Sequence, residues 1–245
     1  MDMPKVAIVA ALEREVGGLI KNWSRIKRTH EGREFTFFEH DDTVLVCGGI
    51  GLEPARRAAE AVIALYHPAL LQSVGFAGAL NAKLRVGEIV SPSVVLDARD
   101  GSRVDIPGGA GTLITFISVA SASQKRNLAQ AYGALAVDVE AAAVAAAARA
   151  HGIPFTATKV VSDGLDFDMP ETARFIDAQG RFRTARFASY TALRPWLWAR
   201  VAALASNSRK AAKALAAHLN NCNQLLQQTG QAYAVEPKTT SISSN

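Results

Sequence analysis

The chain is poor in the residues that stabilise small extracellular domains or bind metals. Only Cys47 and Cys222 are present among 245 residues, so the sequence offers no disulfide framework. Its five histidines show no metal-ligand spacing, and no paired cysteines accompany them. We therefore expect a cytoplasmic protein that uses no metal and no other cofactor.

Long apolar runs are also missing from the chain. None reaches the roughly 18 residues needed to span a bilayer. The first apolar run, residues 6–11, is too short for a secretory signal and lacks a basic lead and a cleavage site. The sequence thus predicts no integral membrane segment and no export signal.

Clustered charge is scarce, although the formal net charge is +5. The basic residues are scattered apart from small groups, and no aromatic residues alternate with them as on a single-strand-binding surface. We therefore reject nucleic acid as a partner. Trp196 and Trp198 stand beside Arg194 and Arg200, which favours helix packing or a subunit interface over contact with a membrane or an oily substrate.

The chain does contain an alternation of apolar runs and helical patterns. This alternation continues as far as Asp163 and is typical of a mixed or parallel sheet covered on both faces, whereas helices dominate beyond it. We expect one α/β domain over residues 1–231, with a central mixed sheet flanked by helices and a helical C-terminal part. The polar residues 232–245 are expected to form a disordered tail.

The expected elements follow from apolar patterning and from turn residues. Strands are predicted at residues 5–11, 34–39, 43–47, 70–74, 88–96, 112–119, 135–138 and 154–161, with a loop at 97–111. Helices are predicted at residues 13–23, 53–66, 123–132, 140–150, 169–178 and about 186–228.

Two glycine-rich segments follow expected strands. Gly48-Gly49-Ile50-Gly51 lies between a strand and a helix, where the backbone can approach a ligand and helix amides can face an anion. Gly75-Phe76-Ala77-Gly78 repeats this arrangement, but the glycine spacing of a dinucleotide-binding turn is missing. One such segment favours a plain tight turn, whereas two at neighbouring strand ends are equally consistent with a ligand pocket.

Three acidic residues also follow expected strands. Glu15 comes after the first strand, Glu140 stands between a short strand and an Ala-rich helix, and Asp163 ends a later strand. Ligands of open α/β sheets gather at the carboxyl ends of strands, where one acidic group can hold a sugar and another can protonate a leaving base. Each residue is also consistent with an ordinary acid at a helix start, so both interpretations stay open.

The order of these motifs resembles the purine-nucleoside phosphorylase/uridine phosphorylase superfamily. Within it, the methylthioadenosine/S-adenosylhomocysteine nucleosidases and the hopanoid-associated phosphorylases are the most similar branches. The resemblance covers roughly residues 5–168. The motifs are Ala11-Leu12-Glu13-Arg14-Glu15-Val16, Gly49-Ile50-Gly51, Gly75-Phe76-Ala77-Gly78-Ala79-Leu80, Leu84-Arg85-Val86-Gly87-Glu88-Ile89-Val90, Val137-Asp138-Val139-Glu140-Ala141 and Ser162-Asp163.

The resemblance implies a nucleoside phosphorylase-like fold, a nucleoside as small-molecule substrate, and a homodimer. It implies that Asp163 is the general acid toward N7 of adenine, helped by Ser162. It also implies that Glu140 binds the ribose 2′- and 3′-hydroxyls and that Glu15 activates water. The implied substrate-binding residues are Ile50, Gly51, Phe76, Ala77, Gly78, Val139, Lys159 and Ser162.

The chain departs from the family's pattern where the nucleophile binds. Phe76 stands where nucleosidases have a small hydroxyl residue, and Val139 and Lys159 replace a Met and an Arg. Ser73 and Phe76 occupy the positions of the Arg and Ser that hold phosphate in phosphorylases. Arg14 or Lys159 would have to replace that phosphate site.

Three functions are therefore weighed. We expect cleavage of the N-glycosidic bond of a 5′-substituted adenosine by water, with release of adenine. The first alternative is the same cleavage by phosphate as co-substrate, on an adenosine that carries a 5′ lipid such as a hopanoid. The second alternative is a non-catalytic nucleoside-binding module in which Phe76 blocks the nucleophile.

Overall fold

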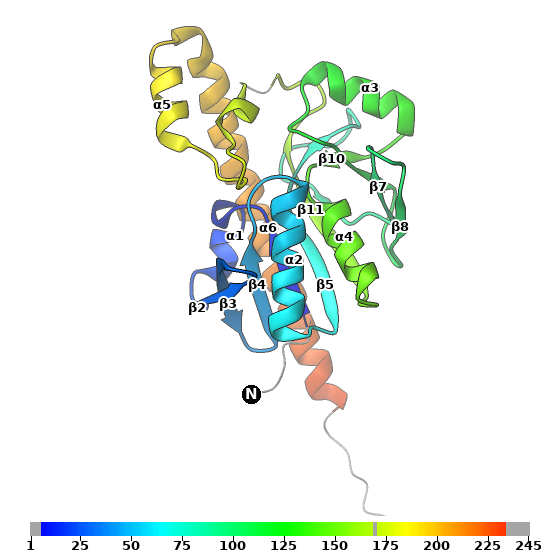
Figure 1. Ribbon diagram of the computed structural model, residues 1–245. Helices are drawn as coiled ribbons and strands as arrows, with labels where there is room; N and C mark the ends of the chain where they lie inside the picture. Colours follow the sequence, from blue (N-terminus) through cyan, green and yellow to red (C-terminus); the bar gives the residue numbers. More distant parts are fainter. Residues whose placement is uncertain (1–5, 169–170, 234–245) are drawn as a thin grey trace, which may run out of the picture.

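The computed structural model describes residues 6–168 and 171–233, and its centre is a twisted mixed sheet (Figure 1). Within these ranges, none of the helices combines the length and the hydropathy needed to cross a membrane. The strands are β1 (Val6–Ala10), β2 (Ser24–His30), β3 (Arg33–His40), β4 (Thr43–Cys47), β5 (Leu70–Ala79), β6 (Ile89–Val90), β7 (Val94–Asp97), β8 (Arg103–Asp105), β9 (Thr112–Thr115), β10 (Ala136–Asp138) and β11 (Phe155–Asp163). The helices are α1 (Glu13–Ile20), α2 (Leu52–Tyr66), α3 (Ala122–Tyr132), α4 (Ala141–Ala150), the 3₁₀ helix η1 (Thr172–Phe175), α5 (Thr184–Ala192) and α6 (Pro195–Tyr233).

The strands are hydrogen-bonded in the order β2-β3-β4-β1-β5-β10-β9-β7-β8, and β11 pairs with both β5 and β6. Strand β5 is the hub, because it pairs in parallel with β1 and β11 and antiparallel with the short β10. Parallel pairing directs the carboxyl ends of β1, β5 and β11 to the same edge of the sheet. The expected mixed sheet is confirmed.

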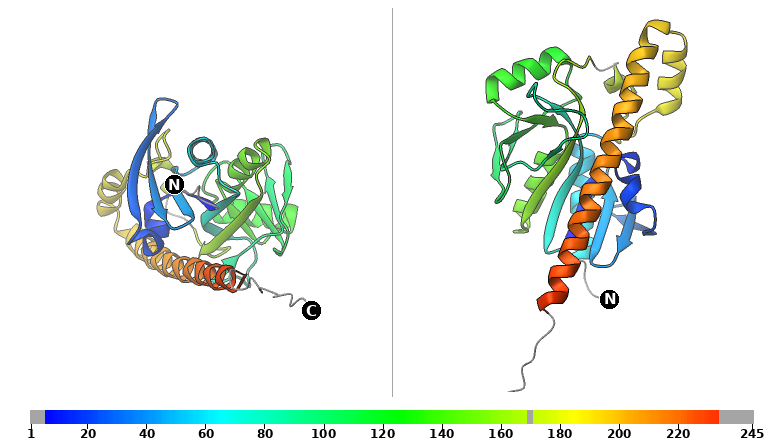
Figure 2. Two further views of the ribbon diagram at one scale, coloured as in Figure 1. Left: turned by 90° about the horizontal axis from the view of Figure 1, so that it is seen from below. Right: turned by 180° about the vertical axis from the view of Figure 1, so that it is seen from behind.

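Helices cover both faces of the sheet. Helices α2 and α4 pack on one face, where small side chains such as Ala58, Val62 and Ala147 lie against β1, β4 and β5. Helices α1 and α6 pack on the other face, where Val16 and Leu215 meet Ile8. Figure 2 shows α6 crossing the back of the sheet as one long rod. These layers bury on both sides the near-continuous apolar strands seen in the sequence.

Two strands were missed and two expected strand boundaries were wrong. Strand β2 shows no apolar alternation because it is a polar, mostly exposed edge strand, and β8 is a three-residue strand within the expected loop. Strand β5 runs on through its glycines to Ala79, and the expected strand 88–96 is split into β6 and β7.

The C-terminal part also differs from expectation. The helix expected at 169–178 is only a 3₁₀ turn within the described residues. The helical stretch expected at about 186–228 divides into α5 and α6, because Pro195 starts a new helix where its missing N–H costs nothing. Residues 232–233 belong to α6, and the rest of the expected tail lies outside the described residues.

Candidate active site

One cavity of about 580 Å³ brings together residues that are far apart in the sequence. Glu15 reaches it from the start of α1, Glu140 from the junction of β10 and α4, and Asp163 from the end of β11. The structure therefore places all three acidic side chains singled out in the sequence around one space. Phe76 is part of the wall and does not fill that space.

A buried cation lies behind two of these carboxyl groups. Lys159, on β11, places its Nζ 2.9 Å from Oδ2 of Asp138, and both side chains are buried. The hydroxyl of Thr115 donates to the other oxygen of Asp138 over 2.7 Å, and the Ala141 N–H donates to Oδ2 over 2.8 Å. Asp138 thus fixes the start of α4 and holds Lys159 in place.

Glu15 is buried in an environment that favours its neutral form. Burial raises its pKa to about 7, although Lys159 and Arg14 nearby lower it in part. Its Oε2 has no hydrogen-bond partner among the described residues. A Cβ added at Gly75 would lie 2.6 Å from this oxygen, so the glycine leaves the carboxyl group its room. The pKa of Glu15 therefore lies near neutral pH, and one of its carboxyl oxygens accepts no hydrogen bond from the described residues.

Glu140 is buried beside the same cation. Burial raises its pKa to about 8, against the influence of Lys159, and the negative charges of Asp138 and Glu15 raise it further. The backbone N–H of Gly51, at the start of α2, donates to its Oε1 over 3.1 Å. Gly51 therefore contributes by orienting Glu140 across the cavity.

Asp163 is held by two donors. The Ser162 hydroxyl donates to its Oδ1 over 2.7 Å, and the ammonium of Lys125 donates to its Oδ2. Lys125 is also buried, and its Nζ donates to the carbonyl of Gly164 over 2.7 Å. A Cβ at Gly78 would lie 3.0 Å from Oδ2 of Asp163, so this strand position suits glycine. The carboxyl group and the ammonium form a buried pair at the cavity wall.

Most of the predicted binding residues line the cavity. They are Ile50, Phe76, Ala77, Gly78, Val139 and Ser162. Gly51 and Lys159 do not line it, since Gly51 bonds to Glu140 and Lys159 pairs with Asp138 behind the wall. Arg14, considered above as an anion ligand, does line it.

Sequence reasoning missed Lys125 and the roof of the cavity. Lys125 lies on α3, which starts with a capping box at Ser121, and nothing in that pattern pointed toward Asp163. The roof is formed by side chains from the segment after β11. Its residues are Thr172, Ile176, Phe182, Thr184, Phe187, Val201, Leu204, Ala205, Ser208, Arg209 and Ala212.

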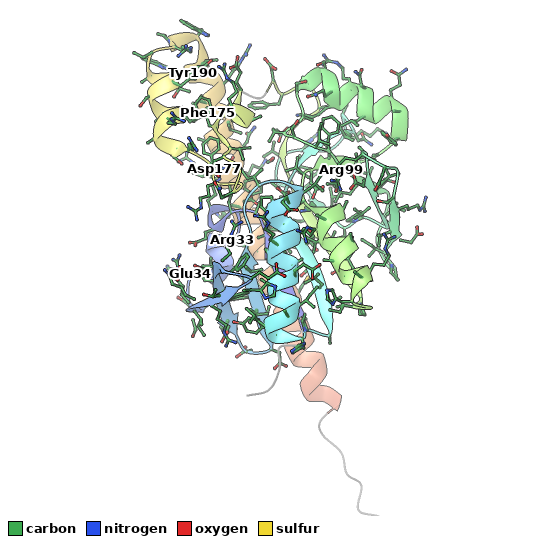
Figure 3. All side chains as sticks on the ribbon, in the orientation of Figure 1. Arg33, Glu34, Arg99, Phe175, Asp177 and Tyr190 are labelled. Carbon is green, nitrogen blue, oxygen red and sulfur yellow. The ribbon has the colours of Figure 1, made fainter. Side chains whose placement is uncertain are left out.

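An aromatic cluster gives the roof its shape. Phe187 packs edge-on against both Phe175 and Phe182, with ring centroids 5.3 Å apart in each pair. Phe175 also contacts Tyr190, and Figure 3 labels these two residues in the segment that forms the roof. The guanidinium of Arg14 lies 5.2 Å from the centroid of the Phe182 ring. The cavity therefore has an acidic floor at the sheet and a largely apolar roof.

The roof meets the floor through a backbone contact. The N–H of Ile50 donates to the carbonyl of Gly180 over 2.8 Å. A Cβ at Gly180, whose φ is +75°, would lie 2.6 Å from the Ile50 carbonyl oxygen. The turn at Gly180 therefore needs glycine both for its backbone conformation and for this close approach. Within the described ranges, no three His, Cys, Asp or Glu side chains are grouped as metal ligands.

Comparisons with known proteins agree with this architecture. The family model "Phosphorylase superfamily" matches residues 5–113 and 110–193. A 5′-methylthioadenosine/S-adenosylhomocysteine nucleosidase of Staphylococcus epidermidis is 26% identical over 195 residues, covering 64% of this chain and 86% of that protein. The nucleosidase of the same name from Buchnera aphidicola is 32% identical over 91 residues, and this match spans 36% of the chain and 39% of the relative.

Solved structures give the same fold. The Helicobacter pylori 5′-methylthioadenosine/S-adenosylhomocysteine nucleosidase, complexed with a pyrrolidine ligand, has a TM-score of 0.64 at 15% identity and covers 90% of this chain and 100% of its own. Futalosine hydrolase of Helicobacter pylori has a TM-score of 0.64 at 14% identity, with coverages of 89% and 98%. These likenesses confirm the nucleoside phosphorylase-like fold. By its family match, the chain belongs to the phosphorylase superfamily and is an enzyme of the nucleoside phosphorylase and nucleosidase family.

Proposed function

We propose that the enzyme uses water to cleave the N-glycosidic bond of a 5′-substituted adenosine and releases adenine. The observation that carries this proposal is the convergence of Glu15, Glu140 and Asp163 on one cavity of about 580 Å³. Such a cavity is large enough for a nucleoside. The proposal is also supported by the relatives, which are named as methylthioadenosine/S-adenosylhomocysteine nucleosidases and a futalosine hydrolase.

Asp163 is the general acid of the proposed reaction. The C1′–N9 bond breaks as N7 of the leaving adenine gains a proton, so that the base departs neutral. The proton comes from the Asp163 carboxyl group, which Lys125 and Ser162 orient by donating to its two oxygens. Lys125 is a positioning residue in this scheme, and Asp163 is the residue that contacts the base.

Glu140 holds the sugar. Its Oε1 is held by the Gly51 N–H, and it lines the cavity from the start of α4, where a ribose with two hydroxyl groups would meet it. A positive charge develops on the sugar ring as the bond breaks. That charge favours the ionised form of Glu140, whose pKa of about 8 in the empty cavity would then fall.

Glu15 activates the attacking water. Glu15 lines the cavity, and its pKa of about 7 lies where a general base works best near neutral pH. The water oxygen then bonds to C1′, and its proton passes to Glu15. The products are adenine and the free 5′-substituted ribose.

Phosphorolysis is the second candidate, because two arginines, Arg14 and Arg209, line the same cavity. Lys159 is less suited to this role because it pairs with Asp138, and Ser73 is buried outside the cavity lining. Against phosphate stands Glu15, whose ionised form would repel an anion. Water is therefore the preferred nucleophile.

The apolar roof favours a bulky, apolar 5′ substituent over a small polar one. Phe182, Phe187, Val201 and Leu204 all face the cavity, and their contact with an aliphatic group would add to affinity. A lipid-like group, including a hopanoid, fits this chemistry. We further propose that the enzyme acts as a cytoplasmic homodimer, as the family resemblance implies.

An adenine-release assay tests these proposals. Purified enzyme is incubated with a panel of 5′-modified adenosines, with and without phosphate, and the sugar product is identified by mass spectrometry. Release in water with free ribose as product supports hydrolysis, whereas dependence on phosphate with a ribose 1-phosphate product supports phosphorolysis. Ligand binding without release across the whole panel would leave only the non-catalytic module.

A further inference from the structure

The α5–α6 hairpin carries an exposed apolar patch at its tip. Helix α5 and the first turns of α6 run antiparallel and project beyond the end of the sheet (Figures 1 and 2). At the turn between them, Leu193 is 78% exposed, Trp196 71% and Trp198 57%. Only two other large hydrophobic side chains in the described part of the chain are so exposed, Ile117 and Tyr132, and neither belongs to the hairpin. We call Leu193, Trp196 and Trp198 the tip patch.

The tip patch is held in place by hydrogen bonds across the hairpin. The indole N–H of Trp198 donates to the carbonyl of Thr191 over 3.0 Å. The guanidinium of Arg194 donates to the carbonyl of Tyr190 over 2.9 Å and lies 3.7 Å from the centroid of its ring. These bonds hold Trp198 and Arg194 against the end of α5, while the side chains of Leu193 and Trp196 remain largely exposed.

The charged side chains of the hairpin itself are of one sign. Between Asp177 and Glu236 the sequence has no acidic residue, while it has six arginines and two lysines. Arg186, Arg194 and Arg200 belong to the hairpin. Two acidic residues of the preceding segment contact it, since Asp168 pairs with Arg200 and Glu171 accepts a hydrogen bond from Tyr190. The tip therefore presents tryptophan and leucine within positive charge.

We propose that the tip patch docks onto the surface of a lipid bilayer that contains anionic lipids. Tryptophan prefers the boundary between headgroups and acyl chains, because its ring is apolar and its N–H is polar. Arginines beside it complement the negative headgroups, and each basic residue near such a surface adds to binding. A protein partner or a second copy of this chain would also cover apolar side chains, but neither would make the protein bind lipid vesicles.

The hairpin connects the tip patch to the cavity. The hairpin that carries the tip patch also supplies roof residues, among them Phe187, Val201 and Leu204. Docking would thus bring the apolar side of the cavity toward the bilayer. The docking itself does not depend on the proposed reaction, since it concerns side chains that do not line the cavity.

Vesicle flotation tests the proposal. The full chain is mixed with vesicles of phosphatidylcholine alone or of phosphatidylcholine with phosphatidylglycerol, at low and at high salt. We expect the protein to float with the anionic vesicles at low salt and to be released by high salt, because charge attraction is screened. The double variant Leu193→Ser/Trp196→Ser should lower the partition coefficient at least about tenfold, the scale for removing two large apolar contacts.

The variant Ile117→Ser is the matched control, since it removes an equally exposed apolar side chain away from the hairpin. It should bind vesicles as the unaltered protein does. Circular dichroism and light scattering are recorded for all three proteins. The proposal would be overturned if the protein did not float with anionic vesicles, or if the double variant floated equally well. It would also be overturned if the protein bound no vesicles and instead formed a dimer that the double variant lost.

Discussion

The ammonium of Lys159 lies 2.9 Å from Oδ2 of Asp138, and the two groups form a buried ion pair. Glu140 and Glu15 also act electrostatically on the same lysine. Burial lowers the pKa of Lys159, but the surrounding carboxyl groups outweigh it and raise that pKa. One cation cannot neutralise three buried carboxylates. Asp138 takes the ion pair, so Glu15 and Glu140 are the groups that retain protons near neutral pH.

This sharing of charge predicts how stability depends on pH. The pKa of Glu15 rises from 4.5 to about 7 on folding, so the native state binds its proton more tightly than the unfolded chain does. Its contribution to the free energy of unfolding is full below pH 4.5 and is lost as the pH rises through about 7. As the pH rises through this range, the free energy of unfolding of Glu15→Gln should therefore increase relative to that of the unaltered enzyme, by at most about 3 kcal/mol.

Urea denaturation at a series of pH values measures this difference. Glu34→Gln, at an exposed glutamate paired with Lys27 on the surface, is the control and should not show the same trend. Parallel pH curves for Glu15→Gln and the unaltered enzyme would contradict the expected protonation of Glu15.

The rate of hydrolysis should also depend on this group. Glu15 accepts a proton from water only when it is ionised, so kcat/KM should rise with pH through an apparent pKa near 7. Glu15→Gln should lower the rate and remove this rising limb. Steady-state kinetics at constant ionic strength test the point, and a limb that persists in the variant would assign it to another group.

Asp163→Asn should lower turnover by roughly a hundredfold or more, the scale for losing a general acid. Asparagine keeps an oxygen for Ser162 and Lys125 but leaves the buried ammonium of Lys125 without its counter-charge, so the variant should be less stable. Circular dichroism verifies that it is folded under the assay conditions. Asp166→Asn removes an exposed acid on the same loop, one that pairs with Arg126, and should leave turnover nearly unchanged. Equal turnover of the two variants would remove Asp163 from the mechanism.

The pair of Lys125 and Asp163 makes a prediction about stability. Lys125→Met leaves the buried Asp163 carboxylate without its cation and should cost about 3–5 kcal/mol at neutral pH. The double variant Lys125→Met/Asp163→Asn should be less destabilised than the sum of the single variants, by about 1–3 kcal/mol. Thermal and urea denaturation complete this cycle. Strict additivity would mean that the two groups do not interact energetically.

Glu140 can be tested through the substrate. If its carboxylate holds the ribose hydroxyls, Glu140→Gln should lower kcat/KM for a ribonucleoside about tenfold to a hundredfold, the range for a hydrogen bond to a charged group. The same variant should cost less with the 2′-deoxy substrate, in which part of that contact is already missing. A cost that is the same for both substrates would place Glu140 away from the 2′-hydroxyl.

The polarity and periodicity of the chain were sufficient to predict the sheet, its covering helices and the acidic residues at strand ends. Those features are local, because a strand that ends in an acidic residue or a glycine can be recognised from a few consecutive residues. Lys125 could not be found this way, since it lies 38 residues before Asp163 and meets it only through the packing of α3. The edge strand β2 was missed because it is polar and mostly exposed, and it pairs with β3 alone.

The arrangement of the cavity separates chemistry from selectivity along the polypeptide. The acidic floor comes from residues up to 163, whereas the roof comes from residues 172–212, and the turn at Gly180 joins the two through Ile50. In the proposed reaction, substitutions in the later segment would therefore enlarge or narrow the pocket for the 5′ substituent while the groups proposed to react keep their geometry. In this fold, new substrate preferences can evolve by exchanging one contiguous stretch of chain, without rebuilding the machinery that breaks the bond.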